Sequence, residues 1–405
     1  MAVRIDVALI GSIQDPVSAT VFPGSAARQG RPVSPGLSAG CRVAPGAVAR
    51  SAVVPAPFVG VFVLGETEPT EANTGLNVLG LTTSDLTVVN GDLTVNNAYV
   101  SANGPTIDRK WVKGHVLMTA TTPVTMTNSF INGRPFAGAA PFEGLVRARN
   151  GSAPATATIS FVNCRIEPVQ PDVGIVTAVG ERLGSFTRCH FKNGSDSIDY
   201  WNPSVPNVQG SYFAGYSFWD NDPKHTNDGS HPGWSHNDHI QNSGSNGGLI
   251  FGNSFDIRAM SGVGNVGTLT ASGFPNRNYG CGVMLTCSNA RITNIVIRKN
   301  WFRFGEVQVC MPLQNGSFDN GNSWSVYDNR HDLGQHGYGG PTTYSHQIIR
   351  WGNTEGPVPA DVHDNVFLPD ANTGALAGTL LPTAVLQGPN NANGQLIVMV
   401  NNSTP

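Results

Sequence analysis

The sequence predicts an all-β solenoid, a fold in which short strands stack coil upon coil. The first indication is composition, because the 405 residues include 48 Gly and 28 Pro and few apolar residues at helical spacing. Such a mixture favours short strands separated by turns. The second indication is a recurring tripeptide, made of a small or amide residue, any residue, and an apolar residue. Repeated strands with variable insertions predict a solenoid whose insertions gather on one face.

Nine matches to this tripeptide begin at Asn97, Asn128, Cys164, Cys189, Ser211, Asn253, Asn300, Asn329 and Asn365. Alternating apolar and polar residues precede several of them, as in residues 158–162, 292–298 and 323–327. Period-two alternation is typical of strands with one buried face. Each match therefore predicts one coil of the solenoid.

The repeat resembles the right-handed parallel β-helix of pectate-lyase-like proteins and many bacteriophage tailspikes, over about residues 76–370. The resemblance implies a ladder of stacked asparagines at one bend, with Cys164, Cys189 and Ser211 as small substitutes. The apolar residue two positions later should point inward and stack on its equivalents. Cys164 and Cys189 on successive rungs would lie near each other, which leaves a disulfide between them as an alternative. We expect free buried thiols that fill small ladder positions, because the chain shows no export signal.

Two flanking regions differ from the repeat. Residues 1–75 are rich in Pro and Gly, and we expect an attachment arm or small β domain that packs mainly against another protein. Residues 371–405 are expected to cap the open end of the solenoid. The chain begins without a cationic signal peptide and contains no apolar run of membrane-spanning length.

Composition also argues against several partners. The formal net charge is -3 and no basic stripe is present, so we expect no nucleic-acid partner. No cysteine or histidine spacing fits a standard metal site, and we expect neither metal nor cofactor.

Titratable residues concentrate in residues 225–241, which hold four of the ten histidines. Within this stretch, residues 235–241 resemble a His-Asn-Asp-Gly-Ile-Gln motif of β-helix proteins from actinobacteria and their phages, with His239 replacing the glycine. The resemblance implies that Asp238 and Gln241 line a groove, with His236 beside them. About one coil earlier, Asp196 and Asp199 precede Tyr200 and Trp201, and stacking should bring these acids near Asp238.

The candidate catalytic residues are therefore Asp238, His236, Asp199 and Asp196. The candidate sugar-binding residues are His239, Gln241, Trp234, Trp201, Tyr200 and Lys224. Two carboxylates about 5 to 9 Å apart would suit glycoside hydrolysis. A lyase would use a base such as His236 or Lys224, together with a cation that neutralises a uronate. Acids in turns also serve simply as acceptors for backbone amides.

Three classes of function remain open. We favour a virion tail component, a tailspike or minor tail protein that is assembled in the host cytoplasm and contacts host-surface polysaccharide through the groove, with or without cleaving it. Its other partners would be tail proteins, bound through residues 1–75, and copies of itself in a homo-oligomer such as a trimer. The alternatives are a free polysaccharide lyase or glycoside hydrolase, and a non-catalytic structural or glycan-binding β-helix.

Overall fold

The computed structural model describes parts of the larger of two compact units, Pro57–Pro405. The described residues are 61–133, 144–149, 154–169, 176–219, 237–263, 280–286, 290–303, 307–311, 323–332, 349–351, 360–368, 386–387 and 397–400. Their helices are α1 (Asn97–Asn103) and the 3-10 helices η1 (Glu71–Asn73), η2 (Gly75–Leu79) and η3 (Thr83–Asp85). No helix in these segments is long and apolar enough to cross a membrane.

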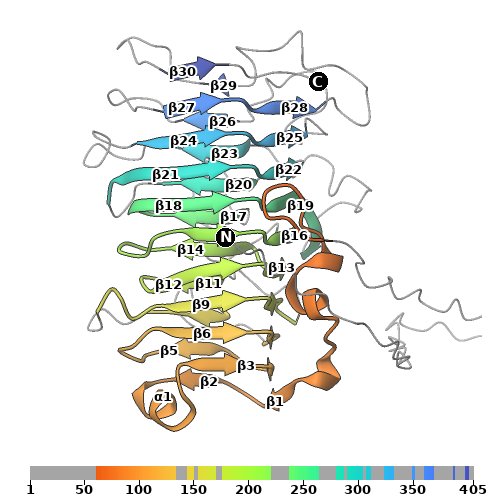
Figure 1. The fold of residues 1–405 in the computed structure, drawn as a ribbon, viewed down its shortest axis with the longest axis vertical. Helices are drawn as coiled ribbons and strands as arrows, with labels where there is room; N and C mark the ends of the chain where they lie inside the picture. The colour runs from red at the N-terminus through yellow and green to blue at the C-terminus, as the bar shows by residue number, and fades with distance from the viewer. Residues whose placement is uncertain are drawn as a thin grey trace, which may run out of the picture. The chain divides into compact units, whose positions relative to one another are not determined.

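Three sheets of ten parallel strands each make up most of this structure (Figure 1). Sheet A contains β1 (Thr87–Val89), β4 (Lys110–Val112), β7 (Phe130–Ile131), β10 (Arg165–Ile166), β13 (His190–Lys192), β16 (Tyr212–Trp219), β19 (Ser254–Val263), β22 (Trp301–Arg303), β25 (Arg330–Asp332) and β28 (Val366–Leu368). Sheet B contains β2 (Leu93–Val95), β5 (Val116–Met118), β8 (Val146–Arg147), β11 (Val176–Gly180), β14 (Asp196–Tyr200), β17 (Asn237–Asn242), β20 (Gly280–Leu285), β23 (Val307–Met311), β26 (Ile349–Trp351) and β29 (Leu386–Gln387). Sheet C contains β3 (Thr106–Asp108), β6 (Val124–Thr127), β9 (Ile159–Val162), β12 (Leu183–Thr187), β15 (Asn207–Gln209), β18 (Ser245–Phe251), β21 (Ile292–Arg298), β24 (Trp324–Tyr327), β27 (Ala360–His363) and β30 (Ile397–Val400).

The chain visits sheets A, B and C in turn, so one strand from each sheet forms one coil. This is the architecture of a parallel β-helix, and the prediction of an all-β solenoid is confirmed. The described strands form ten coils, one more than the number of tripeptide matches. The coils of β1 and β4 lack the tripeptide, and the match at Asn97 belongs to α1 instead. The side chain of Asn96 caps that helix by accepting a hydrogen bond from the backbone N–H of Tyr99 at 2.8 Å.

The corner between sheets C and A has the same short geometry in coil after coil. From β6 onward, two residues connect the sheet C strand to the following sheet A strand. The first of the two has a left-handed backbone, as does Arg109 in the single-residue connection before β4. These left-handed residues are Arg109, Asn128, Asn163, Arg188, Gly210, Gly252, Lys299, Asp328 and Asp364. Glycine and asparagine adopt this conformation readily, whereas Arg and Lys pay about 1–2 kcal/mol, so the corner geometry overrides local preference.

The second corner residue forms a ladder along the stack. Its members are Ser129, Cys164, Cys189, Ser211, Asn253, Asn300, Asn329 and Asn365, all buried. In the upper half, each asparagine Oδ1 accepts a hydrogen bond from the backbone N–H of the preceding ladder residue. The predicted column of Asn253, Asn300, Asn329 and Asn365 is therefore confirmed. Cys164 and Cys189 are free thiols, as expected.

The prediction that Asn128 belongs to this column is wrong by one residue. Asn128 is the left-handed residue, with φ of 48°, and its Nδ2 donates to Asp108 Oδ1 at 2.8 Å. Ser129 takes the ladder position, and its Oγ accepts a hydrogen bond from the backbone N–H of Lys110 at 2.9 Å. The tripeptide fits both registers because Phe130 and Ile131 are both apolar.

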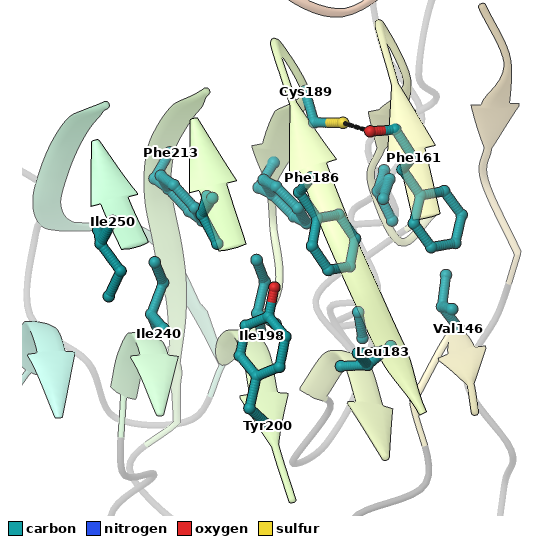
Figure 2. Close-up of a cluster of buried hydrophobic side chains, with 14 of the residues drawn as sticks. Val146, Phe161, Leu183, Phe186, Cys189, Ile198, Tyr200, Phe213, Ile240 and Ile250 are labelled. Carbon is teal, nitrogen blue, oxygen red and sulfur yellow. Dashed lines mark hydrogen bonds between the residues drawn. The ribbon is translucent and has the colours of Figure 1, made fainter. Parts of the chain in front are cut away.

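Aromatic rings stack through the interior two positions after the ladder. The column comprises Phe191, Phe213, Phe255 and Phe302, with consecutive ring centroids 4.7 or 4.8 Å apart. This distance matches the roughly 4.8 Å between neighbouring strands. Apolar side chains from the other sheets fill the space around these rings, as Figure 2 shows for Ile198 and Ile240 near Phe213. Burying one such phenylalanine contributes about 1.5–3 kcal/mol.

Residues 61–81, called the strap here, run along the outside of sheet A toward β1 (Figure 1). Glu68 forms an ion pair with Arg303 at 2.8 Å and accepts a hydrogen bond from Ser254 Oγ at 3.2 Å. Further along, the N–H of Gly75 donates to the carbonyl of Arg188 at 2.8 Å. The described end of the expected attachment arm thus packs on its own β-helix, and the expected boundary at residue 75 falls inside the strap. Residues 1–60 lie outside the described segments, so their docking to another protein stays a prediction.

The expected cap also contains strands of the solenoid. β29 and β30 pair in parallel with β26 and β27 and belong to the tenth coil. The other residues of 371–405 lie outside the described part of the chain.

Replacing Asn300 by alanine tests the ladder. Asn300 Oδ1 accepts from the N–H and Nδ2 of Asn253, and its Nδ2 donates to the carbonyl of Ile250. Removing the amide leaves buried groups unpaired, so we expect a loss of about 2–4 kcal/mol in unfolding free energy, measured by urea denaturation. Asn207→Ala on the outer face of sheet C is the matched control and should change stability by no more than about 0.5 kcal/mol. Equal effects of the two substitutions would contradict the ladder.

Candidate functional site

Long connections collect at the corner between sheets A and B. β16 ends at Trp219 and β17 begins at Asn237, and β19 ends at Val263 while β20 begins at Gly280. The corner between sheets C and A, by contrast, never exceeds two residues between described strands. Long connections also occur at the corner between sheets B and C, where residues 148–158 separate β8 from β9 and residues 312–323 separate β23 from β24. The insertions are therefore not confined to one side of the solenoid, contrary to expectation. Sheet B, which borders both corners, carries the predicted acids.

The predicted acids lie on neighbouring strands. Asp196, Asp199 and Tyr200 are on β14, and Asp238 and Gln241 are on β17. The two strands pair in parallel, with Asp199 opposite Gln241. The sheet therefore brings the two acidic segments together, as stacking predicts. Lys224, Trp234 and His236 lie outside the described residues.

The carboxylates of Asp196 and Asp238 accept hydrogen bonds from backbone N–H groups of the next coil. The N–H of Asp238 donates to Asp196 Oδ1 at 2.7 Å, and the N–H of Cys281 donates to Asp238 Oδ1 at 3.1 Å. Both carboxylates are buried, with exposed fractions of 8% and 1%. Each acid thus links the start of its strand to the next coil, in the manner of the asparagine ladder. This contact accounts for an acid at these positions without a catalytic role.

His239 is a buried, neutral imidazole. Its Nε2 lies 2.9 Å from the carbonyl of Asp256, and its Nδ1 lies 3.1 Å from Ser197 Oγ. A carbonyl can only accept, so Nε2 carries the proton and Nδ1 accepts from the serine hydroxyl. Burial lowers the pKa of His239 to about 4, against weaker opposing effects of Asp256 and Asp238. The ring lies against Phe213, with centroids 5.3 Å apart, and so belongs to the interior.

Tyr200 also belongs to the core. Its side chain is fully buried and its hydroxyl donates to the carbonyl of Gly184 at 3.1 Å. The ring meets Phe186 edge to face, with centroids 6.3 Å apart. The structure therefore does not offer Tyr200 to a sugar, and Figure 2 shows it among the core residues.

Asp199 has a different environment from the other acids. Its Oδ2 accepts a hydrogen bond from Trp201 Nε1 at 2.5 Å, whereas its Oδ1 is buried and has no hydrogen-bond partner among the described residues. Burial raises the pKa of Asp199 to about 7, the Trp201 hydrogen bond opposes this rise, and the negative charge of Asp238 adds to it. Near neutral pH this carboxyl therefore exists in both protonation states, which suits a group that transfers protons.

Trp201 connects this acid to a cation. The guanidinium carbon of Arg149 lies 4.3 Å from the centre of the Trp201 ring, within cation–π range. Trp201 and Arg149 are both half-buried, whereas only 4% of Asp199 is exposed. Arg149, Asp199 and Trp201 are called the acid cluster below. The cluster combines a buried titratable acid on β14 with a half-buried aromatic ring and a half-buried positive charge just beyond the ends of β14 and β8.

Sequence reasoning missed Arg149 and Ser197. Val146 on β8 and Ile198 on β14 both pair with Ala178 on β11, the strand between them. Arg149 follows Val146 by three residues, and Trp201 follows Ile198 by three residues. Counting register across two coils could have paired Arg149 with Trp201. The partner of Ser197 depends on the inward orientation of His239, which no sequence pattern indicates.

No group of three or more His, Cys, Asp or Glu side chains that could hold a metal ion occurs within the described segments.

Comparisons with known proteins assign no family. No protein-family model, no curated protein and no solved structure matches this chain.

Asp199→Asn tests the raised pKa. Below about pH 4 both folded and unfolded chains hold the proton, and between about pH 4 and 7 only the folded chain does, so wild-type stability falls as pH rises through this window. The asparagine variant does not titrate there and keeps an acceptor for Trp201. Its stability relative to wild type should rise by up to about 4 kcal/mol from pH 4 to 7 and then level off. Urea unfolding at each pH measures this difference, and a constant difference would contradict the raised pKa.

Proposed function

We propose that this protein is a virion tail component that contacts host-surface polysaccharide on the outer side of sheet B and cleaves it with the aid of the acid cluster. The observation that carries the proposal is the geometry of Asp199, a buried carboxyl bonded to Trp201 through one oxygen, with no described partner for the other. A carboxyl with pKa near 7 can protonate a leaving-group oxygen at neutral pH.

Two further features support a glycan as the ligand. Trp201 offers an aromatic ring, and such rings provide flat apolar surface next to a polar edge. The long connections from β16 to β17 and from β19 to β20 supply enough residues for the walls of a groove. The likeness of the repeat to tailspike β-helices supports the virion setting. Partner tail proteins, a homo-oligomer and the identity of the glycan belong to the same proposal.

A glycan-cleaving tail protein could be a hydrolase or a lyase, and the alternative to both is a β-helix that binds glycan without cleaving it. A hydrolase would use Asp199 as acid together with a second carboxylate. The charge of Asp238 contributes to the raised pKa of Asp199, but Asp238 Oδ1 accepts a hydrogen bond from the N–H of Cys281, so we assign Asp238 no catalytic role. A lyase would use a base, for which His236 and Lys224 stay predictions. A non-catalytic β-helix would bind the same glycan without releasing products. Either enzyme could also act free of a virion.

Incubation with host envelope polysaccharide tests the proposal. New reducing ends without unsaturated uronate absorbance indicate hydrolysis, and both signals together indicate a lyase. We expect Asp199→Asn to reduce cleavage by about two orders of magnitude or more while thermal stability is unchanged or higher. Binding of the polysaccharide without product release would favour the non-catalytic alternative, and absence of both binding and cleavage would contradict the proposal.

Asp238→Asn is the matched control. The amide oxygen can still accept from the N–H of Cys281, so the coil should be preserved. Loss of the negative charge lowers the pKa of Asp199, and cleavage should persist with its alkaline limit shifted to lower pH. Full loss of cleavage in Asp238→Asn with normal cleavage in Asp199→Asn would instead assign the catalytic role to Asp238.

A further inference from the structure

The indole ring of Trp201 contacts an acid and a cation on two different sides. Its edge donates through Nε1 to Asp199 Oδ2 at 2.5 Å. The guanidinium carbon of Arg149 lies over the ring, 4.3 Å from the ring centre. An aromatic ring carries positive partial charge at its edge and negative partial charge on its face. The ionised carboxylate and the guanidinium therefore each meet the ring where its partial charge is opposite to their own.

The backbone holds Arg149 and Trp201 beside the same glycine of β11. The N–H of Trp201 donates to the carbonyl of Gly180 at 3.1 Å. A Cβ atom at Gly180 would collide with the carbonyl of Ala148, the residue before Arg149, and the φ of Gly180 is 144°. Both observations require glycine at this position. The chain after β8 thus packs closely on β11, which lets Arg149 reach Trp201 although β11 lies between their strands.

The contact with Trp201 is the described interaction of the Arg149 guanidinium. Glu181 follows Gly180 on the coil between Arg149 and Trp201, yet no ion pair joins Glu181 to Arg149 in the described part of the chain. No ion pair joins Arg149 directly to Asp199 among these residues either. A half-buried cation is thus placed on an aromatic face and not on the carboxylate of the neighbouring coil. Any effect of Arg149 on the hydrogen bond of Asp199 therefore passes through the indole ring.

Other titratable or charged groups lie on the strands around Asp199. They are Asp196 and Tyr200 on β14, Asp238 and His239 on β17, Glu181 after β11 and Arg147 on β8. Burial raises the pKa of Asp199 most, the hydrogen bond from Trp201 lowers it, and the negative charge of Asp238 raises it. The indole N–H is therefore the contact that favours the ionised carboxylate.

We propose that Arg149 is a positioning residue for Asp199 and acts on it through the indole ring of Trp201. The positive charge over the ring face draws electron density away from the ring edge, which makes Nε1–H a stronger donor to the carboxylate. The cation also holds the ring in the orientation that directs Nε1 toward Oδ2. Asp199 can then release its proton near neutral pH although it is buried. The role in catalysis rests on the proposed cleavage, whereas the effect on Asp199 does not.

The indole N–H resonance of Trp201 in NMR spectra of the full chain measures this effect without any glycan. The chain contains seven tryptophans, and loss of one resonance in Trp201→Phe identifies the right one. This resonance should titrate in wild type and should not titrate in Asp199→Asn. In Arg149→Met an apolar side chain still covers the ring but the charge is lost. We expect the titration midpoint to rise by about 0.5 pH unit or more and the indole proton to move upfield, because its hydrogen bond is weaker.

Matched variants separate charge from packing. Arg149→Lys keeps the charge and should keep the wild-type midpoint. Arg330→Met removes a cation that lies 5.3 Å from the ring centre of Trp301 on sheet A, and it should leave the midpoint of Trp201 unchanged. An unchanged midpoint in Arg149→Met would overturn the proposal, as would a wild-type resonance that does not titrate. Equal shifts in the Met and Lys variants would also overturn it, because they would indicate packing alone. If Arg149→Met does not fold, Arg149→Gln takes its place with the same expected and contradicting results.

Cleavage assays separate this inference from the proposed function. If Asp199 is the general acid, Arg149→Met should retain cleavage to a higher pH than wild type, because the acid keeps its proton to higher pH. A shifted midpoint in a protein that cleaves no polysaccharide would support the role of Arg149 and contradict the proposed function. Cleavage that depends on Asp199, together with an unshifted midpoint in Arg149→Met, would support the proposed function and overturn the role of Arg149.

Discussion

The two-residue corner between sheets C and A is the constraint on which the rest of the structure depends. A left-handed residue turns the chain, and the ladder residue after it bonds the same position one coil away. Because both positions are fixed, every following sheet A strand starts in register with its neighbour. The phenylalanine column two residues later stacks at the strand spacing for this reason. Variation in length is then confined to the other two corners.

The same constraint explains how the acids meet. Fixed register at the C-to-A corner lets β14 and β17 pair although a long insertion separates them in the sequence. Asp196 and Asp238 repeat the ladder principle with carboxylate oxygens as acceptors. Asp199 lies three residues after Asp196 and no described backbone donor reaches its Oδ1. Burial raises the pKa of Asp199. Strand β14 thus carries two kinds of acid, since Asp196 bonds to the backbone of the next coil and Asp199 titrates near neutral pH.

The sequence predicted the fold more completely than the site. Repeated asparagines and alternating strands indicated the solenoid, the ladder from Asn253 to Asn365 and the juxtaposition of the two acidic segments. Asn128 was assigned one residue out of register because its neighbours fit either alignment. The different roles of Asp196 and Asp199 depend on which backbone amides reach each carboxylate, and no sequence pattern encodes that. The interior position of His239 likewise depends on the Asp256 carbonyl across the coil.

We propose that host glycan contacts sheet B beside the acid cluster. Photo-crosslinking with a photoreactive derivative of host envelope polysaccharide, followed by peptide mass spectrometry, tests it most directly. We expect crosslinks on the peptides that contain Trp201 and Gln241, and excess underivatised polysaccharide should reduce them. Competed crosslinks confined to sheet C, for example near Tyr327 and His363, with none on the peptides of Trp201 and Gln241, would contradict it.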